Sequence, residues 1–156
     1  MVVRAVEKPV KVKRKKKAYH NRTARKKRLI IECRSICSEI CKILWKKKCA
    51  TCNNEGTAAH HFFGWKACSN VRFNFDNLIW LCGDCHARKV HQQGITEPAR
   101  EAIVARIGER DFEELYREAF KPAEYDLEST RKRLGLALIY YRHIERKENE
   151  QQMPRL

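Results

Sequence analysis

The 156-residue sequence lacks an apolar run long enough to cross a bilayer. Its longest apolar runs, such as residues 136–141, fall far short of the roughly 20 residues that a membrane-spanning helix needs. No apolar region follows the basic start, as a secretory signal peptide would require. We therefore expect an intracellular protein with no membrane partner, in the cytoplasm of a microbial or phage-infected cell or in a nucleus.

Acidic residues are nearly absent from the first third of the chain. Residues 1–48 contain 18 Lys and Arg against 3 Asp and Glu, a net charge of +15, whereas residues 49–156 contain 16 of each. The whole net charge therefore lies in a basic segment attached to a neutral body. Such a segment favours a polyanion as partner, above all nucleic acid. A solubilising tail and, for residues 13–17, a nuclear-localisation signal are the other interpretations.

Residues 1–22 also contain few apolar side chains. They cannot bury enough surface to fold alone, so we expect a disordered arm. The arm and the residues after it supply most of the cations that we expect to contact nucleic acid. These are Lys13, Arg14, Lys15, Lys16, Lys17, Arg25, Lys26, Lys27 and Arg28.

The eight cysteines do not suggest a disulfide scaffold, because four of them form two Cys-x-x-Cys pairs beside histidines. The pairs are Cys49–Cys52 and Cys82–Cys85. Two thiolates three residues apart can hold one metal ion from a tight turn, and a second pair completes a tetrahedron that favours Zn²⁺. We expect a closed, structural zinc site that stabilises a small core and does not itself catalyse a reaction.

Before the first pair, apolar residues recur at steps of three and four, which predicts an amphipathic helix over residues 23–48. The apolar stripe consists of Leu29, Cys33, Ile36, Ile40 and Leu44. Cys33, Cys37 and Cys41 lie on or beside this stripe. They are either metal ligands or, as the helical spacing favours, buried small side chains.

The region between and around the cysteine pairs predicts an α+β core over residues 49–94. A first strand is expected over residues 57–63 and a second over 71–75. Residues 78–81 lead into the second cysteine pair, and a short helix is expected over 84–92.

The C-terminal region, residues 95–150, is expected to be helical. One helix covers residues 96–107, and a second begins with a capping box of Asp111 and Glu114 and ends before residue 122. A third helix begins at Asp126, and residues 151–156 form a polar tail. The third helix has an apolar stripe of Leu127, Leu134, Leu138 and Tyr141.

Histidine is concentrated near the cysteine pairs. His60 and His61 are adjacent, and His86 directly follows the second pair. Adjacent residues on a strand point to opposite faces, so one histidine can bind a metal while its neighbour addresses a water or phosphate. The alternative is that one packs and the other is solvated. Together with Asn77, the pattern favours the functional interpretation.

These residues resemble the motif of HNH endonucleases in its zinc-bearing form. The matching pattern is Cys49-x2-Cys52, then Ala59-His60-His61, then Asn77-x3-Leu81-Cys82-x2-Cys85-His86. A narrower resemblance is to the phage NinG/Rap recombination endonucleases, carried by Val71-Arg72-Phe73-Asn74, by Ile107-Gly108 and by the later helix over residues 125–141. Members of that narrower family often have Gly-His before the base and Asn after the last cysteine. This chain has His60-His61 and His86 there, as the wider HNH group does.

The resemblance implies a role for each of these residues and a small ββα-metal fold that the zinc site stabilises. His61 would be the general base, and Asn77 would orient its ring. His60 and His86 would hold a catalytic divalent ion. His91 is either a third ligand of that ion or an ordinary exposed histidine at a helix end.

Hydrolysis of a phosphodiester suits these residue types. A neutral imidazole with a pKa near 6.5 can take the proton of the attacking water. A hard cation such as Mg²⁺ or Mn²⁺ can stabilise the phosphate oxygens. Lys66, Arg72 and Lys89 are near in sequence and are further candidates for phosphate contact.

The resemblance therefore implies a metal-dependent DNA endonuclease that acts on branched DNA or recombination intermediates. The alternatives are a non-catalytic zinc module that binds nucleic acid and a sequence-specific nuclease of the restriction or homing type. Since one such centre cuts one strand, we also expect a two-fold homodimer, whose surface would be one of the two apolar stripes. The competing expectation is that each stripe packs on the chain's own core.

Overall fold

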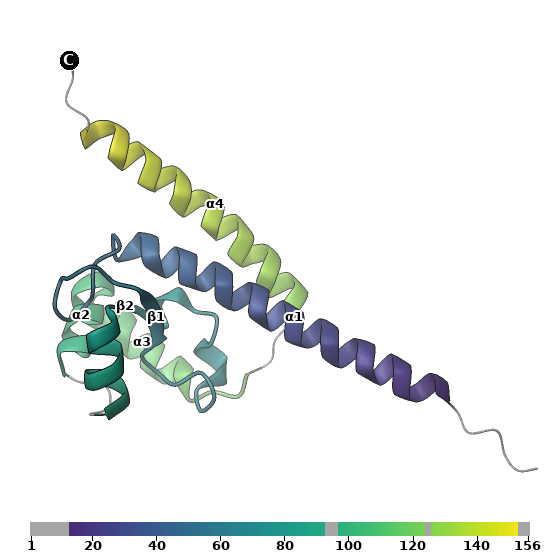
Figure 1. Ribbon diagram of the computed structural model, residues 1–156. Coiled ribbons are helices and arrows are strands. Elements are labelled where there is room, and N and C mark those ends of the chain that lie inside the picture. Colours follow the sequence, from purple (N-terminus) through teal and green to yellow (C-terminus); the bar gives the residue numbers. More distant parts are fainter. Residues whose placement is uncertain (1–12, 93–96, 124–125, 153–156) are drawn as a thin grey trace, which may run out of the picture.

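The computed structural model describes residues 13–92, 97–123 and 126–152, and of residues 13–21 and 89–92 it describes the backbone alone. The described chain is α+β, as predicted, with one small two-stranded sheet and several helices (Figure 1). The elements are α1 (Lys13–Leu44), β1 (Ala58–His61), η1 (Ser69–Val71), η2 (Phe75–Asn77), β2 (Leu78–Leu81), η3 (Cys85–Gln92), α2 (Glu97–Ile107), α3 (Glu109–Ala119) and α4 (Leu127–Gln152). None of the described helices is long and apolar enough to span a bilayer.

The sheet is covered on both faces. β1 and β2 are antiparallel, with His60 opposite Ile79 and His61 opposite Leu78. Ile79 packs in a cluster with residues of α2 and α3, whereas Leu78 packs in a cluster with the cysteines of α1. Because both faces are covered, all four residues of β2 are buried and apolar, without the alternation of a half-exposed strand.

The strand predicted over residues 71–75 is wrong. The chain there forms the short helical turns η1 and η2, and the second strand is β2, over residues that were expected only to lead into the cysteine pair. Val71 and Phe73 are both buried, as the alternation predicts, but they pack in two different clusters because the chain turns between them. Asn74 begins η2, because its side chain accepts a hydrogen bond from the backbone N–H of Asp76.

Helix α1 begins at Lys13, ten residues before the predicted start, so residues 13–22 are helical and the predicted disordered arm is wrong for them. The physical reason is that residues 13–44 contain neither Gly nor Pro, while Lys and Arg are good helix formers. Residues 1–12 of the predicted arm lie outside the described chain. The helix ends at Leu44, where Lys46 and Lys47 adopt positive φ angles of 49° and 61° and turn the chain toward the first cysteine pair.

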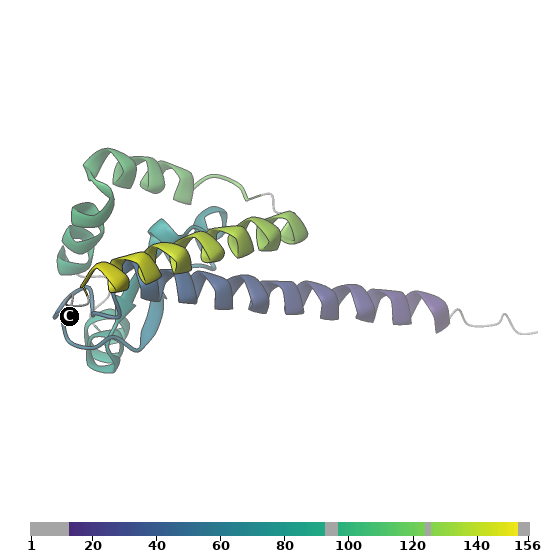
Figure 2. The same cartoon turned by 90° about the horizontal axis from the view of Figure 1, so that it is seen from above.

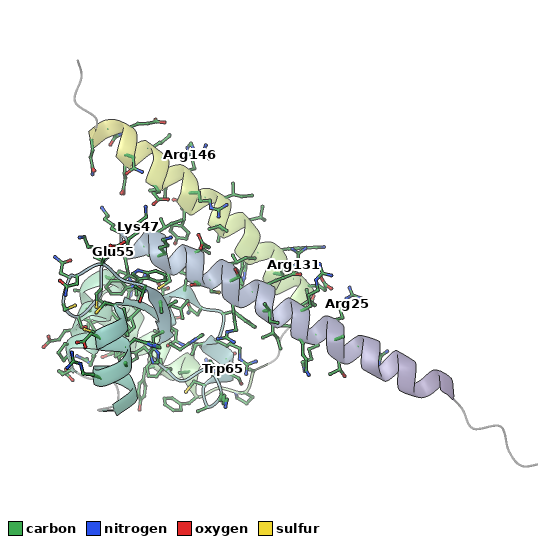
Figure 3. The ribbon with its side chains drawn as sticks, viewed as in Figure 1. Arg25, Lys47, Glu55, Trp65, Arg131 and Arg146 are labelled. Carbon is green, nitrogen blue, oxygen red and sulfur yellow. The ribbon has the colours of Figure 1, made fainter. Side chains whose placement is uncertain are left out.

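Helix α4 runs beside the C-terminal part of α1 and in the same direction (Figures 1 and 2). Three ion pairs join the two helices in parallel order: Arg25–Glu128, Glu32–Arg131 and Glu39–Arg142. Two more join the turn after α1 to α4: Lys47–Glu145 and Lys46–Glu148. Figure 3 labels Arg25 and Arg131 near the start of α4, and Lys47 and Arg146 toward its other end. Exposed pairs of this kind add little stability each, so the apolar contact beneath them holds the helices together.

The two apolar stripes lie largely in this intramolecular contact. Cys33 and Ile40 of α1 and Leu134 of α4 are almost fully buried, and Leu127 packs against the same cluster. Tyr141 stacks edge-on with Phe75, at a centroid distance of 5.6 Å. Each stripe therefore packs on the chain's own core, which was the competing expectation, and neither is a free surface for a second copy.

The C-terminal helices follow the predicted order with shifted boundaries. Helix α3 begins at Glu109 after Gly108, which has a φ of 87°, so the predicted capping box at Asp111 is wrong. The Asp111 carboxylate instead accepts a hydrogen bond from the neighbouring Arg110 side chain. The start of α4 is confirmed, since Asp126 precedes it and accepts from the Glu128 backbone N–H at 3.1 Å. Helix α4 continues to Gln152, two residues beyond the predicted end.

Candidate metal centre and active site

The four cysteines of the two Cys-x-x-Cys pairs converge on one point. The sulfur atoms of Cys49, Cys52, Cys82 and Cys85 all lie within 4.8 Å of one another, a group that could hold a metal ion. The Sγ atoms of Cys52 and Cys82, which come from different pairs, are 3.7 Å apart. The sequence prediction that these four residues form one cluster is confirmed.

Backbone turns aim both pairs at this point. The Cys49 N–H donates to Asn54 O at 2.7 Å and Asn53 N–H donates back to Cys49 O at 2.9 Å, with Asn53 at a φ of 60°. In the second pair, which follows β2, the Cys85 backbone N–H donates to Cys82 Sγ at 3.4 Å. Such N–H···S contacts stabilise thiolate charge, which is the form that binds metal.

Thiol acidity differs among the four cysteines. Burial opposes ionisation of Cys49, yet hydrogen bonds from the Cys82 backbone and from Thr51 lower its pKa to about 6. The Asn54 backbone lowers the pKa of Cys52, but burial and the neighbouring thiols raise it to about 12, so one thiol of the cluster ionises more readily than another. On α1, burial raises the pKa of both Cys37 and Cys41 to about 12. Those two helical cysteines stay neutral thiols in the core, so the interpretation of buried small side chains is confirmed for the α1 stripe.

Two of the predicted metal-binding histidines are neighbours. His60 on β1 and His86 on η3 lie with ring centroids 5.1 Å apart in an edge-to-face arrangement. Both rings are half-buried. The two elements meet because β1 pairs with β2, and the second cysteine pair links the end of β2 directly to η3. The side chain of His91, the uncertain third ligand, lies outside the described side chains, as does that of Lys89.

His61 lies on the opposite face of the sheet from His60. Since cross-strand partners share a face, His61 lies on the side of Leu78 and α1, whereas His60 lies on the side of Ile79. The Nε2 atom of His61 is 2.9 Å from the Arg72 carbonyl oxygen. A carbonyl can only accept, so Nε2 carries the proton and Nδ1 keeps its lone pair.

The surroundings of His61 keep this ring neutral. Burial lowers the pKa of His61, the hydrogen bond to the Arg72 backbone raises it, and the nearby Arg34 and Arg72 guanidinium groups lower it further. The net direction is below the ordinary value of 6.5. At neutral pH the ring therefore offers Nδ1 as a proton acceptor.

Asn77 does not act as the sequence predicted. Its fully buried side chain accepts from the Phe63 N–H at 2.7 Å and donates to Phe63 O at 3.0 Å and to Val71 O at 3.2 Å. His61 Nε2 instead donates to the Arg72 carbonyl, which orients the ring, so the predicted Asn77–His61 contact is corrected. Asn77 fixes both ends of the loop between β1 and η2, and it thereby positions the carbonyl that orients His61.

A pocket of about 320 Å³ opens beside His61 between α1 and the sheet. Its polar lining includes Arg34, Ser35 and Ser38 of α1 together with Arg72. The two guanidinium groups lie 5.0 Å from the centre of the Trp65 ring, and Arg72 Nε donates to the Trp65 carbonyl at 3.1 Å. The indole holds both cations beside the pocket, where they can bind an anion such as phosphate.

The structure thus brings Arg72 into the site, as predicted, and adds Arg34, which sequence analysis missed. Arg34 lies 15 residues before the first cysteine pair, and no local motif marks it. Its one sequence signal is a seven-residue spacing from Lys27, which places both on the same side of a helix. Arg106 of α2 was missed as well; it donates to Asp76 Oδ1 at 3.1 Å and to Asp76 O at 3.2 Å, and so holds the turn that carries Asn77.

The other predicted phosphate contacts lie outside this pocket. Lys66 is exposed, next to Trp65 in the chain. Arg25 pairs with Glu128 and Arg28 with Glu32, whereas Lys26 and Lys27 are exposed and make no ion pair among the described side chains. The backbone of Lys13, Arg14, Lys15, Lys16 and Lys17 is helical, and their side chains lie outside the described part.

Comparison of the chain with protein-family models, curated proteins and solved structures finds no match.

Proposed function

We propose that the chain is a metal-dependent endonuclease that hydrolyses DNA phosphodiester bonds, with His61 as general base. The observation that carries this proposal is the hydrogen bond from His61 Nε2 to the Arg72 carbonyl, in a pocket lined by two guanidinium groups. It fixes the imidazole in the tautomer whose free nitrogen is Nδ1, next to groups that can hold a phosphate. Among the described residues neither Arg34 nor Arg72 forms an ion pair with a carboxylate, which favours an anionic ligand over simple packing.

The proposed metal sites differ in their donors. The four-sulfur cluster suits Zn²⁺, because soft thiolates in a compact group fill a tetrahedron without leaving a place for substrate. His60 and His86 would hold the catalytic ion, Mg²⁺ or Mn²⁺, with the neighbouring imidazoles as its protein ligands. When bound, this cation supplies charge neutralisation at the non-bridging and leaving oxygens of the phosphate.

His60 and His61 lie on opposite faces of the sheet, so in this proposal the substrate meets them at an edge. Within the described chain the sheet has two strands, so β1 pairs with β2 along one edge and its other edge carries no strand. His61 is also the last residue of β1. The proposed path of the DNA strand crosses this edge, with His60 on one side and His61 on the other.

The chain's residues account for the proton and the charge of the reaction. His61 Nδ1 takes a proton from a water whose oxygen forms the new bond to phosphorus. The bond from phosphorus to the 3′-oxygen breaks, and that oxygen takes a proton from solvent. Arg34 and Arg72 hold the phosphate in place while its negative charge increases.

The proposal is tested by cleavage of linear duplex, single-stranded, forked and four-way DNA in Mg²⁺ and then in EDTA. The resemblance to NinG/Rap nucleases favours the branched substrates. We expect Mg²⁺-dependent cleavage that His61→Ala lowers by about 10²–10⁴, the usual contribution of a general base. His143→Ala is the matched control, because His143 is an exposed histidine on α4.

DNA binding and metal content should be unchanged in His61→Ala. Wild-type cleavage by that variant would remove His61 from the mechanism. DNA binding without cleavage of any of the four substrates would instead favour the non-catalytic zinc module, which the basic helix α1 also fits.

A further inference from the structure

The N-terminal part of α1 projects beyond the other described elements (Figures 1 and 2). Figures 1 and 2 show this part extending past the start of α4, and the ion pairs that join the two helices begin at Arg25. Residues 13–28 include ten Lys and Arg and no acidic residue. A helix with this composition has no apolar stripe for a protein partner, and its cations repel one another unless a polyanion neutralises them.

The same helix enters the candidate active site. Arg34 and Ile31 line the pocket beside His61, and Ile31 is 65 % exposed. Lys27 lies seven residues before Arg34, about two helical turns and on the same side of α1. The pocket therefore adjoins a helix whose cations continue away from His61, among them Lys27, which forms no ion pair among the described side chains.

We propose that α1 is a ruler for duplex DNA, with one duplex arm lying along it from Arg34 toward Lys13. This inference rests on the proposed nuclease function and adds the substrate class and the length of its bound arm. Twenty-one residues at a rise of about 1.5 Å span about 32 Å. At about 3.4 Å for each base pair, that length corresponds to about nine base pairs from the phosphate that His61 addresses.

The composition favours a duplex over a single strand. Proteins that bind single strands stack successive bases on aromatic side chains. Residues 13–28 contain one aromatic residue, Tyr19, among ten cations. A straight, cationic helix instead matches the regular phosphate spacing of a straight duplex.

The experiment measures kcat/KM of the full-length protein on a four-way DNA junction. One arm is shortened in steps of two base pairs, from about 20 to about 4. Cleavage should be constant for arms longer than about ten base pairs and fall about tenfold or more below nine, as phosphate contacts are lost. Cleavage that stays constant down to about four base pairs would overturn the ruler and leave the nuclease proposal intact.

Two full-length variants separate helix length from charge. In the first, Lys13, Arg14, Lys15, Lys16 and Lys17 are all replaced by Gln. Its cations begin at Arg22, about 18 Å from Arg34, so the threshold should move to about five base pairs. In the second, Ala24→Pro keeps every charge but breaks the straight path at an exposed position. For this variant, kcat/KM should no longer rise with arm length. A wild-type dependence on arm length would mean that the cations act without the straight helix.

A binding measurement keeps the ruler testable if no DNA is cleaved. Labelled linear duplexes of the same lengths are titrated with His61→Ala protein, with and without the five Gln substitutions. The difference in affinity between the two proteins should appear only for duplexes longer than about five base pairs and stop growing near nine. A difference that is the same at every length, or that is equal on single strands, would contradict the proposal.

Discussion

The cysteine cluster and the histidine site are only a few residues apart, yet their surroundings differ. The cysteines gather at the end of the hairpin where β2 runs into Cys82, and Cys49 and Cys85 are almost fully buried. His61 lies at the other end of β1, half-buried beside an open pocket. Four sulfur donors could satisfy a metal completely, whereas two imidazoles would leave positions for water and phosphate. In the proposed function, the first centre stabilises the fold and the second performs the chemistry.

The largest expected effect comes from breaking the cysteine cluster. Binding of a structural Zn²⁺ contributes about 10–16 kcal/mol, which equals or exceeds the stability of most domains. We therefore expect Cys82→Ser to lose zinc and to unfold the region around β2 and η3, measured by metal analysis and thermal unfolding. Cys68→Ser is the matched control, because Cys68 is buried in another cluster. This variant protein should keep its zinc. Full stability of Cys82→Ser would contradict a structural role for the cluster.

The next effect tests how Asn77 supports the histidine site. Asn77→Ala removes three hydrogen bonds from a fully buried position and leaves the Phe63 and Val71 groups unpaired. We expect a loss of about 2–4 kcal/mol in the free energy of unfolding, measured by urea denaturation, with zinc content unchanged. Cleavage below the unfolding transition should also fall, since the loop carries the carbonyl that orients His61. Asn74→Ala, which removes one hydrogen bond at a half-buried turn, should cost less.

The smallest expected effect tests whether the charge of Arg34 lowers the pKa of His61 in the pocket. In the proposed mechanism His61 acts in its neutral form, so activity should fall as the pH drops through its pKa, which lies below 6.5. The positive charge of Arg34 helps to lower that pKa, and a cation held by His60 would act in the same direction. Arg34→Gln should therefore move the acid limb of the kcat profile to higher pH.

Arg34→Lys is the matched variant, since it keeps the charge but loses the planar contact with Trp65. Both variants should raise KM about tenfold or more, because each weakens a charged contact to phosphate worth about 1.5–3 kcal/mol. Only Arg34→Gln should shift the acid limb. Equal pH profiles for the two variants would show that Arg34 does not act on His61 through its charge.

Sequence analysis found the parts of the molecule that local chemistry determines. The Cys-x-x-Cys spacing predicts the cluster of four cysteines, and the three-four periodicity around Cys33 predicts the inner face of α1. Prediction from the sequence fails where tertiary contacts determine the structure. Val71 and Phe73 alternate like a strand but pack in two different clusters, and Asn77 is close to His61 in the motif but bonds to the loop backbone.

Arg34 shows the same limit for function. Its place beside His61 depends on how α1 crosses the sheet, and no spacing within the sequence records that crossing. The early start of α1 is a different kind of error. The basic composition of residues 13–22 predicts disorder, although residues without Gly or Pro can extend a helix that the core already anchors.

The most direct test of the division between the two centres is a titration of the zinc-loaded protein with Mn²⁺. Binding is measured as the loss of the electron paramagnetic resonance signal of free Mn²⁺. Wild-type protein should bind one Mn²⁺ while keeping its zinc. His86→Ala should bind Mn²⁺ at least about tenfold more weakly, with the same zinc content and the same thermal unfolding, because the removed imidazole is one of only two proposed ligands. Unchanged Mn²⁺ binding by His86→Ala, or loss of zinc from it, would contradict the account.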